Sequence, residues 1–258
     1  MSNILLSVIT PTKNSAGTIV RFLSHLPFSH RSLFQIVIVD CLSTDQTLKL
    51  IKDFSCGLNQ IVVSESDSGI YDAMNKGSKI SLGKYLIFLN SDDWFDTTSF
   101  KSLFDNLLSE SHPMYIFQQK RWVTNSKFIL DSPVLAQTLY STIPHQCVII
   151  SRDLFIQLGA FDLKYKICAD YDLLLRAYLN GIDCKKIEIP LVNFSTDGFS
   201  SKVQSVPTYY TDVLKIWRKY NLIDLPKVIN FTLKSALLAP KILFYSLMKR
   251  RFKNNLFT

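Results

Sequence analysis

Short apolar runs alternate with helix-like stretches over the first 100 residues of the chain. The apolar runs predict strands at residues 5–10, 35–39, 61–64 and 85–89, and the pattern between them predicts helices at 15–26, after the capping residues 44–47, and at 73–81. Strands that alternate with helices indicate parallel pairing through right-handed crossovers. The pattern therefore predicts an α/β fold, a Rossmann-like and mostly parallel sheet flanked by helices.

Polar residues cluster directly after three of these strands, at 10–14, 40–45 and 90–93. Ligands bind beyond the carboxyl ends of the strands in such sheets, so the three segments predict one polar pocket. For Ser43-Thr44-Asp45 taken alone, a helix cap is the alternative explanation.

Two adjacent carboxylates, Asp92 and Asp93, follow the apolar run 85–89. Their charges repel each other unless a cation lies close, and Mg²⁺ or Mn²⁺ bound by carboxylates and substrate phosphates removes this conflict. Such a metal stabilises the charge that develops on a departing diphosphate. An ordinary turn is the alternative, because Asn-Ser-Asp-Asp is also typical of turns.

The net charge of +8 is distributed unevenly along the chain. Residues 1–200 hold 18 Lys and Arg against 19 Asp and Glu, whereas residues 201–258 hold 11 basic and two acidic residues. The near-neutral first part opposes a nucleic-acid binder, which needs basic residues spread over its binding face.

The basic C-terminal part follows a helical pattern, with Lys227, Lys234 and Lys241 recurring every seven residues. No run reaches the ~18 uncharged apolar residues that a membrane span needs. We expect a basic amphipathic tail that binds in the plane of an anionic membrane surface. A helical appendage that packs on the catalytic domain is the alternative.

The cysteines and histidines do not form a metal-binding pattern. The five cysteines contain no CxxC pair, and no signal peptide precedes them, so we expect reduced thiols in a cytosolic protein. The four histidines are scattered along the chain, which disfavours a zinc site.

Seven segments, taken in order, resemble the family 2 glycosyltransferases with the GT-A fold. They are SVITPTKN at 7–14, IVDCLSTDQT at 38–47, SESDSGIYDAMNKG at 64–77, GKYLIFLNSDD at 83–93, PHQ at 144–146, LGAFD at 158–162 and ADYDLLLR at 169–176. Each segment alone is weak, but their order and spacing match over about residues 4–200, and the set is highly specific. The 69–77 run also resembles enzymes of bacterial surface-polysaccharide assembly.

The resemblance implies a donor site for a nucleotide-sugar. Thr10 and Pro11 would line the nucleoside pocket, Asp40 would lie beside the base or ribose, and Asp67 would face the nucleotide-sugar. Further donor-binding residues are expected at Asn14, Lys76 and Ser91.

The resemblance also implies a metal. Asp92 matches the last acidic position of the family's Asp-X-Asp motif, the ligand of Mn²⁺ or Mg²⁺, and Asp93 would support it. Cys41 stands where the family often has a second aspartate that contacts the base, which leaves the nucleotide open. Asn90 replaces the first acidic residue of the motif, and Ala169 stands where a glutamate often precedes the catalytic aspartate.

Asp170 matches the family's general base, and the resemblance implies inversion at the anomeric carbon. The alternative for this segment is a helix start, where acidic residues are favoured, with Asp172 and Arg176 as an i,i+4 pair. His145 and Gln146 are expected on the acceptor side, although His145 could equally be satisfied internally.

Together these predictions divide the chain into a catalytic domain at 1–205 and a tail at 206–258. Within the catalytic domain, residues 1–100 form the donor-binding half and residues 101–205 the acceptor-binding half. The expected reaction is sugar transfer to a lipid-linked glycan in O-antigen or capsule assembly, at the inner face of the cell membrane. The rival interpretations are a non-catalytic nucleotide-sugar-binding module and a nucleotidyltransferase, whose Gly-rich phosphate loop residues 11–17 match poorly. Tyr71 and Trp94 are expected either to stack on sugars or to lie in the core.

Overall fold

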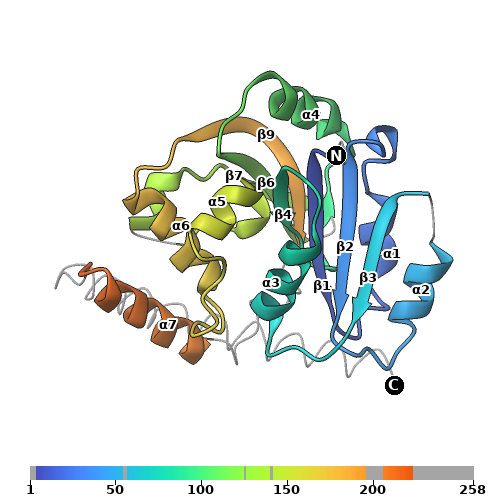
Figure 1. Cartoon of the computed structure of the whole chain (residues 1–258), viewed down its shortest axis with the longest axis horizontal. Coiled ribbons are helices and arrows are strands. Elements are labelled where there is room, and N and C mark those ends of the chain that lie inside the picture. The colour runs from blue at the N-terminus through green and yellow to red at the C-terminus, as the bar shows by residue number, and fades with distance from the viewer. Residues whose placement is uncertain (1–3, 55–56, 125, 140–141, 196–205, 223–258) are drawn as a thin grey trace. The chain divides into compact units, whose positions relative to one another are not determined.

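The computed structural model describes residues 4–54, 57–124, 126–139, 142–195 and 206–222. The chain forms two compact units, Met1–Thr196 and Asp197–Thr258. The described part of the first unit is a sheet of nine strands with helices against it (Figure 1).

The strands are β1 Leu6–Thr12, β2 Phe34–Asp40, β3 Asn59–Ser64, β4 Tyr85–Phe88, β5 Trp94–Phe95, β6 Met114–Thr124, β7 Lys127–Asp131, β8 Val148–Ser151 and β9 Cys184–Ser195. The α-helices are α1 Ile19–Ser24, α2 Thr47–Asp53, α3 Ile70–Ile80, α4 Phe100–Ser109, α5 Arg152–Gln157, α6 Ala169–Leu179 and α7 Val206–Lys219. Short 3₁₀ turns lie at Phe28–His30, Thr97–Ser99, Leu135–Leu139 and His145–Cys147.

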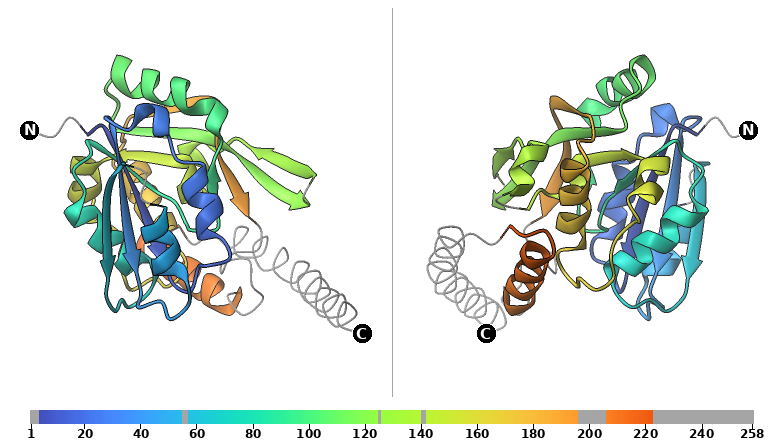
Figure 2. Two further views of the ribbon diagram at one scale, coloured as in Figure 1. Left: turned by 90° about the vertical axis from the view of Figure 1, so that its right-hand side faces the viewer. Right: turned by 60° about the vertical axis from the view of Figure 1, so that its left-hand side comes forward.

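The strand order is β3-β2-β1-β4-β8-β6-β9-β5, with β7 paired to β6. The first four strands are parallel, as the sequence predicts. Beyond β4 the sheet is mixed, because β8 is antiparallel to both β4 and β6, and only β6 and β9 form a parallel pair. Figure 2 shows β6 and β7 as a hairpin that extends from the sheet.

The alternating side chains of the parallel strands build two different faces. On one face, Val8 and Ile36 belong to a core cluster with Phe22 of α1 and Ile51 of α2. On the other face α3 approaches the sheet closely at Gly77, where a Cβ atom would lie 2.5 Å from the Cγ2 atom of Ile9. A glycine is therefore required sterically for this helix to lie against β1.

Strand β1 extends past the proline at which the sequence predicts its end. Pro11 is paired in register with Val39, and Thr12 with Asp40. The carbonyl of Ile9 accepts from Leu89 on the β4 side, whereas that of Thr12 accepts from Cys41 on the β2 side. Peptide groups alternate along a strand, so Pro11 faces the β4 side, where pairing has already ended and its missing N–H breaks no ladder bond.

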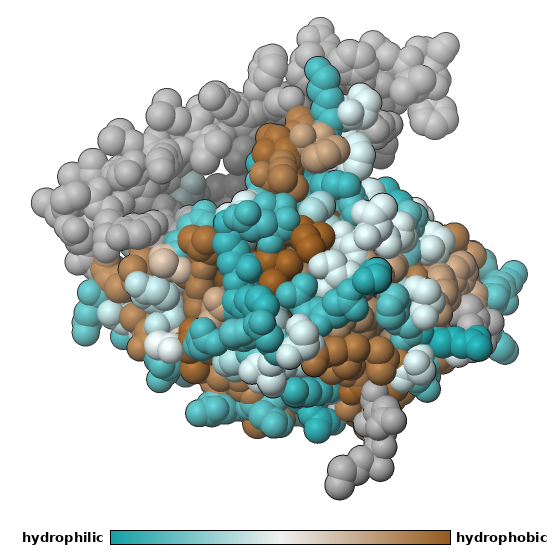
Figure 3. Space-filling model, turned by 90° about the horizontal axis from the view of Figure 1, so that it is seen from above, coloured by the Kyte–Doolittle hydropathy of each residue, from teal (hydrophilic) through white to brown (hydrophobic). Residues whose placement is uncertain are grey.

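In the second unit the structure describes the amphipathic helix α7, in which Val213, Ile216 and Trp217 are buried. The basic tail beyond residue 222 lies outside the described residues, so the membrane-surface prediction stays a prediction. Among the described helices, none combines the length and apolarity that crossing a bilayer requires. No disulfide joins the four cysteines in the described part of the chain. Polar and apolar side chains are intermixed on the described surface in Figure 3.

Candidate functional site

The polar segments after β1, β2 and β4 meet at one edge of the sheet, as the sequence predicts. Strand β1 lies between β2 and β4, so the three carboxyl ends are neighbours. The backbone N–H of Asn14 donates to the Ser43 hydroxyl at 2.8 Å, and the hydroxyl of Ser91 donates to that of Ser15, the residue after Asn14, at 2.9 Å. Hydrogen bonds thus join all three segments into one surface.

Asp40 holds the residues of this surface together through hydrogen bonds to its carboxylate. Its carboxylate is completely buried and accepts from the Thr12 hydroxyl at 3.1 Å, the Ser64 hydroxyl at 2.8 Å and both the N–H and the hydroxyl of Ser43. A buried carboxylate is tolerated when donors surround it in this way. The residue expected beside the base or ribose therefore has both oxygens engaged by protein donors.

Hydrogen bonds to the loop after β1 hold the loop after β2 in place. Asn14 adopts a left-handed conformation with φ 49°, and its side-chain oxygen accepts from the Thr44 N–H at 2.9 Å. Asp45 accepts from the N–H of Thr47, the first residue of α2, at 2.9 Å and from the Ala16 N–H at 3.1 Å. Hydrogen bonding to Thr47 lowers the pKa of Asp45 below its ordinary value. The residue at the N-cap position of α2 is Gln46, whose side chain makes no capping bond, so Asp45 binds the first N–H of the helix from one position before the cap.

Buried polar atoms without a protein partner gather at this edge. Among the described residues there are four such atoms, and three of them belong to Thr10 (Oγ1), Asn90 (Oδ1) and His145 (Nε2). Thr10 and Asn90 lie at the ends of β1 and β4, and His145 lies three residues before β8, which pairs antiparallel with β4. Such groups are uncommon in proteins, and their usual partner is a water molecule, an ion or a ligand.

Asp92 and Asp93 occupy different environments in the turn between β4 and β5. Asp93 is completely buried and accepts from the side-chain amide of Gln146 at 3.2 Å, whereas Asp92 is half-buried. Gln146, expected on the acceptor side, is buried and turned inward. The Asp92 carbonyl accepts from Arg21 at 2.8 Å, and this guanidinium lies 3.9 Å from the ring centre of Trp94.

The chemistry of this turn fits a metal bound together with a substrate. Within the described ranges, no three His, Cys, Asp or Glu side chains converge as a ready-made metal site. Mg²⁺ and Mn²⁺ do not need one, because one or two carboxylates and the phosphates of a substrate suffice. Asp92, half-buried in this turn, is the carboxylate that could bind such a metal, whereas Asp93 is fully buried and bonded to Gln146.

Asp67 and Lys76 shape the segment between β3 and α3. The ammonium of Lys76 contacts a Glu65 carboxylate oxygen at 2.9 Å and donates to the Ser66 carbonyl at 2.6 Å. Asp67 accepts from the Gly69 N–H at 3.0 Å. These contacts hold both side chains within the segment that follows β3, whose first residue, Glu65, donates its N–H to the Asp40 carbonyl at 2.9 Å.

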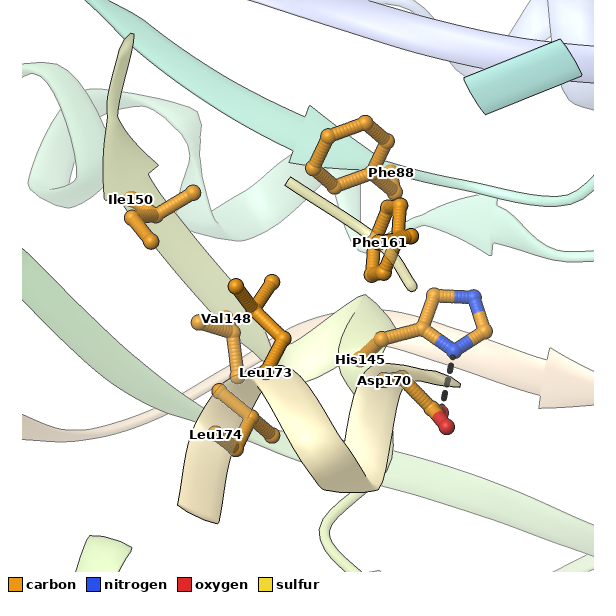
Figure 4. Close-up of a pocket in the computed structure, with 8 residues that line it drawn as sticks. All are labelled: Phe88, His145, Val148, Ile150, Phe161, Asp170, Leu173 and Leu174. Atoms are coloured by element: carbon orange, nitrogen blue, oxygen red, sulfur yellow. Dashed lines mark hydrogen bonds and ion pairs between the residues drawn. The ribbon is translucent and has the colours of Figure 1, made fainter. Parts of the chain in front are cut away.

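Asp170 lies in the first turn of α6 and is held by side chains from two other elements. It accepts from the Tyr71 hydroxyl at 2.8 Å. It also accepts from the Nδ1 atom of His145 at 3.0 Å, the contact drawn in Figure 4. The side chains of Asp170 and His145 are 14% and 15% exposed. Together with Phe88 and Phe161, they line a small, mostly apolar cavity (Figure 4).

Asp172, two residues further on, has the structural role expected of it. Its buried carboxylate accepts from the Nε atom of Arg176 at 2.8 Å, and the same guanidinium donates to the carbonyls of Leu158 and Ala160. The two acidic residues of α6 therefore differ: Asp172 ties the helix to the preceding loop, whereas Asp170 faces Tyr71 and His145.

Comparison with known proteins gives a family and several relatives. Residues 7–153 match the model of "Glycosyl transferase family 2". A PGL/p-HBAD biosynthesis glycosyltransferase of Mycobacterium bovis is 30% identical over 184 residues, which cover 68% of this chain and 70% of the relative. The amylovoran biosynthesis glycosyltransferase AmsB of Erwinia amylovora is 27% identical over 214 residues, covering 75% and 70%.

Solved structures share the fold. TarS 1-349 of S. aureus superposes with a TM-score of 0.66 at 21% identity, and the match covers 83% of this chain but only 66% of that one. TarS has also been solved with UDP-GlcNAc. The mannosyltransferase PcManGT of Pyrobaculum calidifontis, in complex with GDP-Man and Mn²⁺, gives a TM-score of 0.67 at 14% identity, covering 92% and 72%. The expected GT-A fold is confirmed.

Proposed function

The chain belongs to glycosyl transferase family 2 and is a glycosyltransferase, and from its site we propose that it moves a sugar from a nucleotide-diphosphate donor to an acceptor hydroxyl with inversion. One observation carries the proposal: the adjacent residues His145 and Gln146 contact Asp170 and Asp93, respectively. This short segment joins the expected base to the turn that carries the expected metal ligand. A donor bound at the strand ends would therefore have its anomeric carbon between Asp170, the expected base, and Asp92, the expected metal ligand.

On the donor side, the nucleotide would occupy the surface made by the loops after β1, β2 and β4, with Thr10, Pro11, Asn14 and Ser91 around it. Asp92 would hold Mn²⁺ or Mg²⁺ against the diphosphate, and the bound metal would stabilise the negative charge of the leaving group. The TarS and PcManGT complexes, which contain UDP-GlcNAc and GDP-Man, support a nucleotide-sugar as the donor class.

On the acceptor side, Asp170 would remove the proton of the attacking hydroxyl. The bond from the acceptor oxygen to the anomeric carbon forms while the bond from that carbon to the diphosphate oxygen breaks, so the nucleoside diphosphate leaves and the proton stays on Asp170. A carboxylate so placed contributes about 10²–10⁴-fold to such a transfer. His145, which contacts Asp170, would border the acceptor.

For the acceptor we propose a lipid-linked glycan used in a cell-surface polysaccharide or glycolipid. The names of the Mycobacterium and Erwinia relatives, which refer to PGL/p-HBAD and amylovoran biosynthesis, support this class. The net charge of +9 on residues 201–258 supports peripheral binding to an anionic membrane at its cytoplasmic face.

The test is release of nucleoside diphosphate from a panel of nucleotide-sugars, with Mn²⁺ or Mg²⁺, by the wild type, Asp92→Ala and Asp105→Ala. Asp105 is an exposed carboxylate on α4, paired with Lys101, and serves as the matched control. We expect slow hydrolysis of one donor that a chelator and Asp92→Ala abolish and Asp105→Ala leaves intact. If no donor is hydrolysed but one raises the melting temperature, the non-catalytic nucleotide-sugar-binding module becomes the better interpretation. If no donor does either, the proposed function is wrong.

A further inference from the structure

We infer that Tyr71 is a positioning residue, whose hydroxyl fixes the carboxylate of Asp170 for proton removal. The inference rests on the proposed function, because it assumes that Asp170 is the base. Tyr71 is the second residue of α3 and Asp170 the second residue of α6, so a single hydrogen bond joins the donor-binding half of the chain to the base.

The ring of Tyr71 is held firmly, which makes the position of its hydroxyl well defined. Its side chain is 6% exposed, and its ring centre lies 5.1 Å from that of Phe161. The hydroxyl lies 2.8 Å from Oδ1 of Asp170 and 2.6 Å from the carbonyl oxygen of Ile167. The phenol thus contacts both the base and the segment that leads into its helix.

The chemistry of the phenol makes it a donor to the carboxylate. Burial raises the pKa of Tyr71 well above its ordinary value, and the charge of Asp170 adds to the effect. The hydroxyl therefore keeps its single proton, and both neighbouring oxygens can only accept. A hydrogen bond to a charged group is stronger than one to a neutral group, which favours Asp170 as the acceptor.

Two donors at different oxygens fix the plane of a carboxylate. Oδ1 of Asp170 accepts from Tyr71 and also from the backbone N–H of Tyr171 at 2.8 Å, while Oδ2 accepts from His145. Without the phenol, the carboxylate loses one of the two side-chain contacts that prevent its rotation. Misplacement of a catalytic group by about 1 Å can cost about 10²-fold in rate.

The segment before Tyr71 links this contact to the donor side. Asp67 accepts from the Gly69 N–H, and Asp72 accepts from the Ser68 N–H at 2.9 Å. These bonds give the turn into α3 a defined shape, so the residue expected to face the nucleotide-sugar and the phenol that holds the base belong to one ordered turn. Tyr71 would therefore align the base with the bound donor.

The experiment compares Tyr71→Phe with Tyr85→Phe. Both substitutions keep a buried ring and remove one hydroxyl. The Tyr85 hydroxyl, however, donates to the carbonyl of His112 at 3.2 Å and contacts no carboxylate in the described part of the chain. The measured quantity is kcat for sugar transfer from the donor identified in the panel. We expect Tyr71→Phe to lower this kcat about 10–100-fold with the KM for the donor unchanged, and Tyr85→Phe to leave kcat intact. In an Asp170→Asn background, Tyr71→Phe should cause no further loss, because the group it positions is gone.

The inference is overturned if Tyr71→Phe keeps wild-type kcat or if Tyr85→Phe lowers kcat equally. It is also overturned if Tyr71→Phe lowers kcat as much in the Asp170→Asn background as in the wild type. When Asp170→Asn abolishes transfer but Tyr71→Phe does not impair it, the base assignment stands and only this inference fails. When Asp170→Asn itself transfers sugar normally, the proposed base is wrong and Tyr71 has no base to position.

Discussion

Asp40 and Asp170 are both buried for the most part, yet their surroundings differ in kind. The carboxylate of Asp40 is fully enclosed, and its donors come from the strand ends and loops around it. The carboxylate of Asp170 keeps 14% exposure, and its side-chain donors, Tyr71 and His145, come from two distant segments.

This difference distinguishes a carboxylate that stabilises the fold from one that can take part in a reaction. A carboxylate surrounded by hydroxyl and N–H donors has little capacity left for a substrate, and its removal leaves several buried donors unsatisfied. A carboxylate at the rim, held by two side chains, keeps capacity to accept one more proton. In the proposed function, Asp40 would therefore account for the shape of the strand ends where the donor binds, and Asp170 for the reaction there.

Asp170→Asn should give the largest effect, because it removes the base while keeping the shape of the side chain. The turnover number for sugar transfer should fall about 10²–10⁴-fold. The measurement is steady-state transfer with the donor identified from the panel. Asp172→Asn, on the same helix, is not a suitable control, since its carboxylate anchors Arg176; Asp105→Asn on α4 is.

Asp40→Asn should act mainly on stability. One oxygen becomes an NH₂ group that faces the donors Ser43 and Ser64, so the free energy of unfolding in urea should fall by about 2–3 kcal/mol. The matched variant is Asp45→Asn, an exposed carboxylate of the same loop, which should change stability much less. Equal stability losses in both variants would show that burial does not distinguish Asp40.

The sequence predicts the parallel half of the sheet well and the contacts of Asp170 poorly. The strands and the three polar segments follow from local patterns, and so does the Asp172–Arg176 pair at i,i+4. The contacts of Tyr71 and Gln146 with acidic side chains span 99 and 53 positions, and no local pattern encodes them. The antiparallel pairing of β8 with β4 was missed for the same reason.

Arg21 illustrates the same limit within the donor edge. It lies 71 positions before Asp92, on a helix whose pattern shows only an exposed basic residue. Its stacking on Trp94 and its bond to the Asp92 carbonyl depend on how α1 packs beside β5. The aromatic residue considered for sugar stacking is thus covered by a guanidinium.

The smallest effect is expected far from the site, at His112. Asp183 and then Glu110 raise the pKa of His112 above its ordinary value of 6.5 in the folded protein. A raised folded-state pKa stabilises the protein fully below the unfolded pKa, and this contribution is lost as the pH rises through the folded-state pKa. His112→Gln should lower the melting temperature at pH 5 by no more than about 2 °C and leave it unchanged at pH 9. A larger loss at pH 9 than at pH 5 would contradict this sign.

The measurement that tests the central claim most directly is titration of the hydrolysable nucleotide-sugar into Asp170→Asn in the presence of Mn²⁺. If the strand ends bind the donor and Asp170 only removes a proton, the variant will bind the donor with wild-type affinity while its rate of sugar transfer falls about 10²–10⁴-fold. If donor binding disappears together with transfer, Asp170 belongs to the donor site. The claim that the strand ends bind the donor while Asp170 acts only as a separate base is then wrong.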